Sequence, residues 1–238
     1  MDQKSISLNK YISQTGICSR READKWIEAG RVKLNGEIAR KGNRVLPEDV
    51  VTLDDEVISK AVQPVYLMLN KPAGITCTTD LRDKSNIIDF LNYKERIFPI
   101  GRLDKPSTGL ILLTNDGDIV NKILREENYH EKEYEVRVNR PVNETFIRRM
   151  SGGLPIMGVV TKKCKVERTK KFVFRITLTQ GLNRQIRRMC EYLGFEVVAL
   201  KRVRIMHLKL GQLKIGAYRP LNKGELQTLL KRVESSKK

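Results

Sequence analysis

Residues 101–118 read GRLDKPSTGLILLTNDGD, and the larger part of the chain is interpreted from this stretch outward. The apolar run Leu110–Leu113 is long enough for a buried strand, and the following Asn115-Asp116-Gly117 is a turn signal. Glycines and a proline precede the strand, and among them the carboxylate of Asp104 lies between two cations. The stretch therefore predicts a strand that follows a stiff loop holding one carboxylate in place.

The size and composition of the chain indicate a folded protein. It has 238 residues, of which 40% are hydrophobic, enough to form the core of one large or two modest domains. No apolar run approaches the roughly 18 residues of a membrane span, and the polar N-terminus does not resemble a signal peptide. We therefore expect a cytoplasmic protein that does not enter a membrane.

The charge of the chain predicts a polyanionic partner. There are 46 Lys and Arg against 28 Asp and Glu, for a formal net charge of +18. Residues 1–60 contribute only +1 of this excess, so the larger part of the chain carries +17. Because no segment combines strong amphipathicity with a cationic face, nucleic acid is favoured over a membrane surface.

Cysteine and histidine usage argues against metal and redox chemistry. The four cysteines are scattered and form no Cys-x-x-Cys pair, and only two histidines accompany them. This is a poor set for a zinc site or for disulfides. A Gly-rich phosphate cradle is also absent, so we expect neither a metal nor a cofactor.

Residues 1–60 predict a small helix-and-hairpin unit. Ser19 and Glu22 have the spacing of a capping box, and Gly30 ends the helix that they begin. Asn35-Gly36 is a type I′ turn signal between two short strands. A further strand is expected at residues 50–53.

The rest of the chain alternates between strand and helix signals. Helices are expected at residues 87–91, after Asp116, after Asn143 and after Asn222. Strands are expected at residues 65–69, 133–138, 155–165, 172–178 and 197–210.

A basic helix is predicted between Gln180-Gly181 and Leu193, with Asn183 as its cap. Its apolar residues recur at helical spacing, which directs Arg184 and Arg188 away from the core. Arg187 lies at the margin of the apolar stripe. A cation in that position needs an anionic partner.

Four stretches together resemble the motifs of RNA pseudouridine synthases of the RsuA/RluA type. They are residues 101–118, Asn70-Lys71-Pro72-Ala73-Gly74, Glu131-Lys132-Glu133-Tyr134 and Asn183-Arg184-Gln185-Ile186-Arg187-Arg188-Met189. Residues 8–53 resemble an S4-type RNA-binding domain. Segments such as Phe172–Arg175 are similar to the F branch of the large-subunit synthases.

The resemblance implies an α+β fold in two domains. An S4-like domain would occupy residues 1–60, with a linker at 61–64. A catalytic domain at 65–232 would contain a mixed, mainly antiparallel sheet flanked by helices. A short basic tail would follow at 233–238.

The implied reaction is isomerisation of a uridine in RNA to pseudouridine, without a cofactor. Asp104 would be the catalytic carboxylate, Tyr134 would stack on the uracil, and Arg187 would pair with Asp104. Whether Asp104 attacks the sugar or the base remains open. Because the base is inaccessible in a stacked helix, the nucleotide must be flipped out.

The implied substrate is 23S rRNA, bound by a monomer. The expected RNA-contacting residues are all basic: Arg102, Lys71, Arg184, Arg188, Lys10, Arg20, Arg21, Lys25, Arg31 and Lys33. A synthase acting on 16S rRNA or tRNA remains an alternative. A non-catalytic S4 protein is another, although it would leave Asp104, Tyr134 and Arg187 unexplained.

Overall fold

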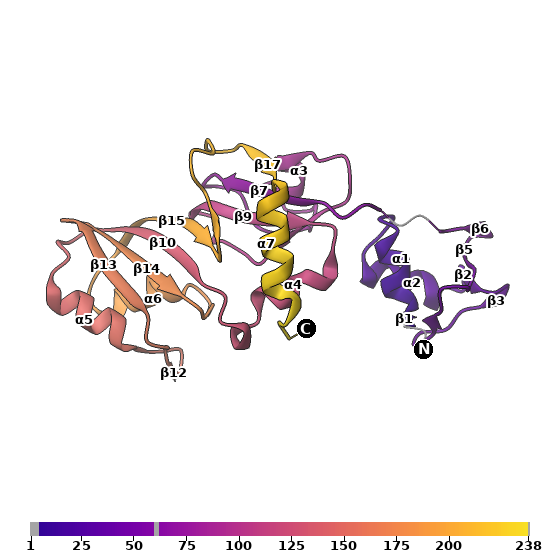
Figure 1. Cartoon of the computed structure of the whole chain (residues 1–238), viewed down its shortest axis with the longest axis horizontal. Helices are drawn as coiled ribbons and strands as arrows, with labels where there is room; N and C mark the ends of the chain where they lie inside the picture. Colours follow the sequence, from indigo (N-terminus) through magenta and orange to yellow (C-terminus); the bar gives the residue numbers. More distant parts are fainter. Residues whose placement is uncertain (1–4, 60–61, 238) are drawn as a thin grey trace. The chain divides into compact units, whose positions relative to one another are not determined.

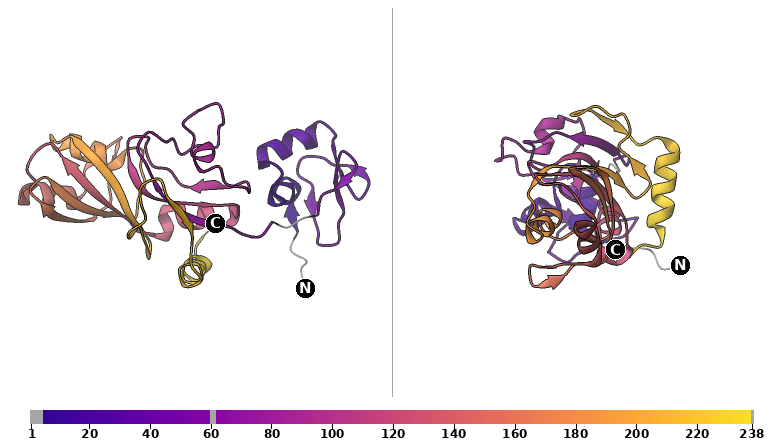
Figure 2. Two further views of the ribbon diagram at one scale, coloured as in Figure 1. Left: turned by 90° about the horizontal axis from the view of Figure 1, so that it is seen from above. Right: turned by 90° about the vertical axis from the view of Figure 1, so that its left-hand side faces the viewer.

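The computed structural model describes residues 5–59 and 62–237, which divide into two compact units. The first unit ends at Pro64 and the second begins at Val65, while residues 93–96 group with the first. Residue 60, the last of the expected S4-like domain, and residue 61, the first of the expected linker, lie outside the described ranges. Each unit has its own sheet and its own core (Figures 1 and 2).

The N-terminal unit combines two helices with short antiparallel strands (Figure 1). Its elements are β1 (Ile6–Ser7), α1 (Leu8–Gln14), α2 (Arg20–Glu28), β2 (Val32–Leu34), β3 (Glu37–Ile38), β4 (Arg44–Val45), β5 (Val51–Leu53) and β6 (Glu56–Val57). The Ser19 side chain accepts a hydrogen bond from the Glu22 N–H, which begins α2 and forms one half of the expected capping box, while the Glu22 carboxylate pairs with Lys25. Asn35 and Gly36 both have positive φ, so the expected tight turn joins β2 to β3.

A mixed sheet forms the centre of the second unit. Its strands are β7 (Tyr66–Lys71), β8 (Phe98–Ile100), β9 (Thr108–Thr114), β10 (Lys132–Val138), β13 (Lys165–Lys170), β14 (Val173–Leu178), β15 (Val197–Ile205), β16 (Leu208–Lys209) and β17 (Tyr218–Pro220). The order is β13-β14-β10-β15-β9-β7-β17, with β8 beside β9 and β16 beside β15. Among the described strands only β9 and β15 pair in parallel, so the expected mixed, mainly antiparallel sheet is confirmed.

Two pairs of helices pack against the two ends of this sheet and form two separate cores. They are α3 (Ile87–Leu91), α4 (Gly117–Leu124), α5 (Glu144–Gly152), α6 (Gln185–Tyr192) and α7 (Lys223–Glu234), with a 3₁₀ turn, η1 (Glu126–Asn128), after α4. Phe146 of α5 and Met189 of α6 belong to one core with β10 and β14. Ile123 of α4 and Leu229 of α7 belong to a second core with β7 and β9. Figure 1 shows these pairs of helices at opposite ends of the sheet.

Helix α6 begins differently from the expectation. Asn183 is not its cap, because Arg184 occupies that position with a φ of 50° and the helix starts at Gln185. The Gln185 side chain accepts a hydrogen bond from the Leu182 N–H at 3.0 Å. A left-handed turn thus replaces the expected side-chain cap, and Asn183 instead accepts hydrogen bonds from Arg188.

Two expected strands are interrupted by tight turns. Residues 155–165 contain the hairpin of β11 (Pro155–Ile156) and β12 (Val159–Val160). Strand β13 starts only at Lys165, the last residue of the expected strand. Residues 197–210 divide into β15 and β16. Met157 and Met206 both adopt left-handed backbone conformations, with φ of 53° and 51°. Gly158, which has a φ of 76°, was an available turn signal for the first break, whereas Met206-His207 contains no residue typical of turns.

The C-terminal helix extends into the expected basic tail. Helix α7 continues to Glu234, and Val233 is buried in the core beside α4. Beyond the helix, His130 Nε2 lies 3.0 Å from Ser236 Oγ. The Lys237 N–H donates to the Asn128 side chain at 3.0 Å. The described part of residues 233–238 is therefore packed against the second unit.

Gly109 makes the parallel junction of the sheet possible. It pairs with Arg202 across β9 and β15, and its φ is +103°. A Cβ atom at this position would lie 2.2 Å from the Arg202 carbonyl oxygen and 2.7 Å from its nitrogen. Since both obstacles are backbone atoms, a side chain at residue 109 would push the two strands apart.

Replacing Gly109 by Ala is expected to lower the free energy of unfolding by roughly 3 kcal/mol, because overpacking and an unfavourable φ add together. Urea denaturation followed by circular dichroism measures the change. Gly152→Ala is the matched control, since Gly152 lies in α5 with nothing within 4 Å of its added Cβ. Equal stability of the two variants would contradict this account of the junction.

Candidate active site

Two backbone hydrogen bonds fix the loop that carries Asp104 within the second unit. The Asp104 carbonyl accepts the Ser107 N–H at 2.9 Å, which closes a turn through Lys105 and Pro106. The Lys105 carbonyl accepts the Gly74 N–H at 2.8 Å. These bonds fix the backbone on which the carboxylate is mounted, immediately before β9.

The buried side chain of Lys71 also stabilises this loop. Expected to contact RNA, it is instead 0% exposed, because its ammonium group donates to the carbonyls of Pro72, Ile75 and Lys105 at 2.7, 2.8 and 3.4 Å. Burial lowers the pKa of its ammonium group. Lys71 therefore links the end of β7 to the Asp104 loop and is not available to RNA in this structure.

Arg187 approaches Asp104 from α6. Its Nε lies 3.5 Å from Asp104 Oδ2 without hydrogen-bond geometry, and its guanidinium donates to Ser107 Oγ at 3.2 Å and to the Val197 carbonyl at 3.4 Å. The Arg187 side chain is 16% exposed and that of Asp104 is 33% exposed. The partly buried arginine thus has the anionic partner that its position in the helix required.

The other basic residues near Asp104 are more exposed. Arg184 Nη1 lies 3.9 Å from Asp104 Oδ2, so this arginine faces the carboxylate as well as solvent. Arg102 is exposed beside the loop. Arg188 bonds to Asn183 and does not line the cavity described below. Arg102 and Arg184 are therefore the better placed for RNA phosphates.

Tyr134 and Asp104 line one cleft of about 890 Å³ within the second unit. Tyr134 lies on β10 opposite Ile176 of β14 and Arg202 of β15, and part of its ring packs against the core. A pocket of this volume accommodates a nucleoside. The expected catalytic residues Asp104, Tyr134 and Arg187 are thus brought together, although they are up to 83 residues apart in the chain.

Two further cations of the cleft were not identified from the sequence. Lys132 and Arg202 are 8% and 3% exposed, and both line the cleft. Burial and the nearby Arg202 lower the pKa of Lys132 to about 8. A signal was available for Lys132, because it precedes Tyr134 by two residues in a strand and so shares its face.

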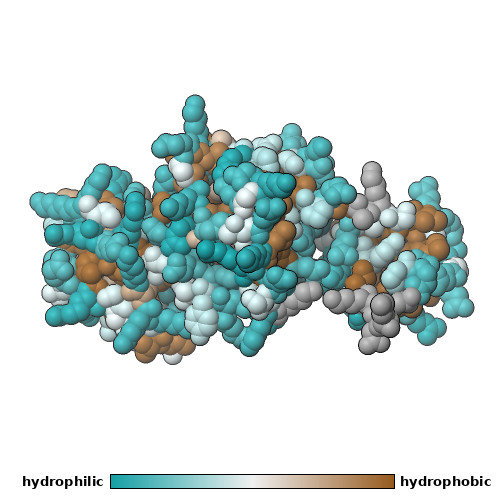
Figure 3. Space-filling model, in the orientation of Figure 1, coloured by the Kyte–Doolittle hydropathy of each residue, from teal (hydrophilic) through white to brown (hydrophobic). Residues whose placement is uncertain are grey.

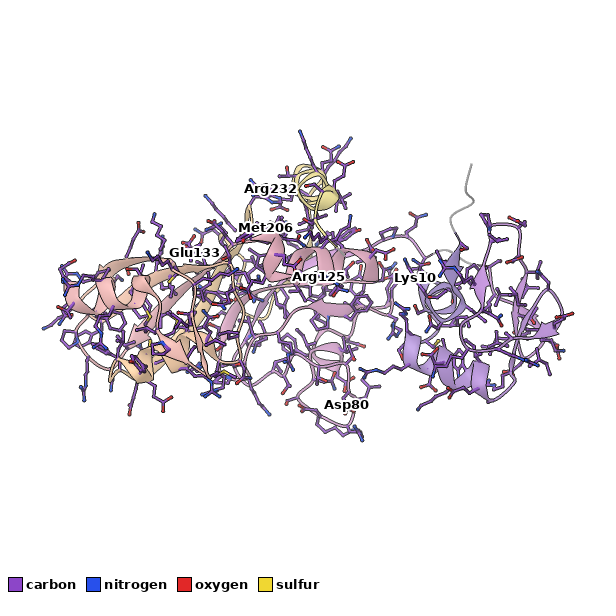
Figure 4. All side chains as sticks on the ribbon, turned by 90° about the horizontal axis from the view of Figure 1, so that it is seen from below. Lys10, Asp80, Arg125, Glu133, Met206 and Arg232 are labelled. Atoms are coloured by element: carbon purple, nitrogen blue, oxygen red, sulfur yellow. The ribbon has the colours of Figure 1, made fainter. Side chains whose placement is uncertain are left out.

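The opposite face of β10 is occupied by structural ion pairs. Glu133 accepts from Arg204 Nε at 2.7 Å, and Arg204 Nη1 donates to the Met206 carbonyl at 2.7 Å. Figure 4 labels Glu133 and Met206 in this region. These contacts join β10 to β15 and leave the Tyr134 face for the cleft.

Most expected RNA-contacting residues of the N-terminal unit also have internal partners. Arg31 pairs with Asp54 and stacks over the Trp26 ring, and Lys33 pairs with Asp55. The remaining members show other contacts or exposure: Arg20 donates to Ser7 and Asn9, Lys25 pairs with Glu22, Lys10 is half-buried and Arg21 is exposed. Exposed ion pairs are weak, so RNA phosphates can compete for these cations.

The described residues show no candidate metal site and no membrane span. Over residues 5–59 and 62–237, no cluster of three or more His, Cys, Asp or Glu could hold a metal ion. No helix in these ranges is long and apolar enough to cross a membrane. Hydrophilic residues cover much of the surface visible in Figure 3.

The fold and the cleft together define an enzyme that modifies a nucleoside within RNA. The chain belongs to the RNA pseudouridylate synthase family, whose sequence profile matches residues 65–192, and an S4 domain profile matches residues 7–51. It is an RNA pseudouridine synthase, as the motifs indicated.

Several relatives extend over nearly the whole chain. The dual-specificity RNA pseudouridine synthase RluF of Escherichia coli K12 is 56% identical over 99% of this chain and 82% of its own length. The ribosomal large subunit pseudouridine synthase B of Bacillus subtilis is 33% identical over 93% and 94%. A solved pseudouridylate synthase structure superposes with a TM-score of 0.70 at 34% identity, covering 94% of this chain and 100% of that one. The expected similarity to the F branch is confirmed.

Arg187→Gln is expected to lower the single-turnover rate of pseudouridine formation about 100-fold, because it removes the cation beside Asp104. Rates at saturating enzyme on an rRNA fragment measure the effect. Arg188→Gln is the matched control, since the described hydrogen bonds of the Arg188 side chain go to Asn183 and not to the Asp104 loop. Equal rates for the two variants would contradict the assignment of Arg187.

Proposed function

We propose that this synthase isomerises a specific uridine of 23S rRNA and accepts a second RNA as well. The observation that carries the proposed site is the placement of Asp104, 3.5 Å from Arg187 Nε and on the same cleft as Tyr134. The two-substrate proposal is supported by the relative from Escherichia coli, whose name describes dual specificity.

The cleft requires an extruded nucleotide. The atoms that react, N1 and C5 of uracil and C1′ of ribose, cannot reach a carboxylate while the base is stacked. Exposed Arg102 and Arg184 at the cleft bind the phosphates on either side of the target. The Tyr134 ring then stacks on the flipped uracil.

Asp104 acts as the ionised carboxylate of the reaction. The N1–C1′ bond breaks, the uracil turns over, and C5 bonds to C1′. The proton on C5 is then lost, and N1 is protonated. Atoms and electrons balance, so no oxidant or reductant is required. Arg187 holds the carboxylate, and its bond to Ser107 holds the loop in register.

The N-terminal unit contributes affinity for RNA, mainly through phosphate contacts. With the second unit it forms a cytoplasmic, monomeric enzyme. Because 17 of the 18 net positive charges lie outside residues 1–60, long-range attraction of RNA comes chiefly from the rest of the chain.

Pseudouridine mapping by carbodiimide-based primer extension tests the proposed function. Wild type and Asp104→Asn are each incubated with 23S rRNA, 16S rRNA and tRNA. We expect a new stop on 23S rRNA and one on a second RNA with wild type alone. Asp104→Asn should fold and bind RNA but remain inactive, because an amide cannot replace the carboxylate.

Full turnover by Asp104→Asn would refute the proposed mechanism. A stop only on 16S rRNA or tRNA would refute the substrate assignment while leaving the site intact. Tight RNA binding without any stop would favour the non-catalytic alternative.

Arg21→Gln is expected to weaken RNA binding several-fold. The slope of log affinity against log salt should become shallower by the amount that corresponds to the loss of about one phosphate contact. Filter binding at several salt concentrations measures both quantities. Arg31→Gln is the control, because Arg31 is already paired with Asp54 and should cost less. A larger loss for Arg31 would reverse the assignment of the two arginines.

A further inference from the structure

Lys132 and Arg202 are two buried cations that the reaction, as described so far, does not use. Arg202 lies directly opposite Tyr134 in the pairing of β15 with β10. Lys132 precedes Tyr134 by two residues and lines the same cleft. The two cations therefore flank the residue that is expected to stack on the uracil.

Neither cation is neutralised by the protein. Arg202 Nε donates to the Leu110 carbonyl at 2.7 Å, but its Nη2 is buried without a hydrogen-bond partner. Lys132 Nζ reaches the His130 carbonyl at 3.3 Å. Within residues 5–59 and 62–237, neither forms an ion pair with a carboxylate. Buried, unpaired charge is costly to keep, and this cost is offset when an anionic ligand enters the site.

The depth of the two cations identifies which part of the RNA they meet. Arg102 and Arg184 are exposed and line the same cleft. A backbone phosphate can therefore bind these two arginines at the surface and need not reach the buried Lys132 and Arg202. Lys132 and Arg202 are more than nine-tenths buried, where a flat, flipped base fits better than a bulky phosphodiester.

The base becomes anionic during either route open to Asp104. If N1–C1′ breaks first, its electron pair remains on N1 and is shared with O2 and O4. If the carboxylate adds to C6, the C5=C6 pair moves toward C5 and O4 as an enolate. The C6–O bond then breaks when C5 loses its proton, which restores C5=C6 and returns the pair to the carboxylate. In both cases the charge disappears when C5 has bonded to C1′, lost its proton, and N1 has been protonated.

We propose that Lys132 and Arg202 form a cationic subsite that stabilises the transient negative charge on uracil. The proposal rests on the proposed function, because it needs a uridine to react in this cleft. Fixed charges aimed at a developing anion in a water-poor site are among the largest contributions to catalysis.

The subsite should respond to pH. Several charged or titratable groups line the same cleft as Lys132 or lie beside it: Arg202, Asp104, Arg102, Lys105, Arg184, Tyr134, Cys77 and His130. Burial and Arg202 lower the pKa of Lys132 to about 8. Its charge is therefore present below pH 8 and lost as the pH rises through that value, so the rate should fall between pH 7 and 9.

Single-turnover kinetics at saturating enzyme, with Kd measured separately, test the proposal on the mapped RNA substrate. Lys132→Met should reduce the rate about 100-fold at pH 7 while Kd changes less than twofold. Lys132→Arg should retain most of the rate and move its decline above pH 9, because arginine stays charged. Lys209→Met is the matched control and should behave as wild type, because the Lys209 side chain is exposed at the end of β16.

A higher Kd with a smaller salt slope and an unchanged saturated rate would overturn the proposal in favour of a phosphate site. An unchanged rate and Kd for Lys132→Met would also overturn it. If Lys132→Met does not fold, as judged by circular dichroism, the wild-type profile decides, and a rate independent of pH from 7 to 9 refutes the subsite. Failure of the proposed function is distinct, because wild type itself would then form no pseudouridine.

Discussion

The close approach of β9 and β15 at Gly109 is the constraint on which the rest of the second unit depends. The missing side chain allows the backbone of Arg202 to lie against the strand that follows the Asp104 loop. Tyr134 reaches the site from β10, on the other side of β15, and Arg187 reaches it from the helix before β15. A shift between these two strands would therefore move all of the expected catalytic groups relative to one another.

Electrostatics within the cleft are strongly asymmetric. Asp104 is the one acidic residue among those that line it, whereas positive charge comes from Arg102, Lys105, Lys132, Arg184 and Arg202. Such a site attracts RNA and favours anionic species that form inside it. In the N-terminal unit, by contrast, several cations pair with carboxylates of the same unit, consistent with its small net charge. The net positive charge that attracts RNA therefore lies almost entirely outside residues 1–60.

Much of the fold and of the candidate site could be predicted because local signals agree with tertiary structure. The cap at Ser19 and the turn at Asn35-Gly36 follow from spacing. The pairing of Arg187 with Asp104 was expected from the resemblance to the synthase motifs, because helical spacing alone indicated only that Arg187 needs an anionic partner. The breaks at Met157 and Met206 and the left-handed Arg184 were missed, because tertiary packing imposes positive φ on residues that do not favour it. The burial of Lys71 and Arg202 was missed for a related reason: partners distant in sequence decide whether a cation faces solvent.

Lys71 has a consequence for how the loop can be observed. Its amine is covered by the backbone carbonyls of Pro72 and Ile75 and by that of Lys105 in the Asp104 loop, so a reagent reaches it only when this backbone moves away. Most lysines of this chain are on its surface and will react with acylating reagents at once. Slow labelling of Lys71, followed by mass spectrometry, would therefore report local opening of the backbone that joins the end of β7 to the Asp104 loop.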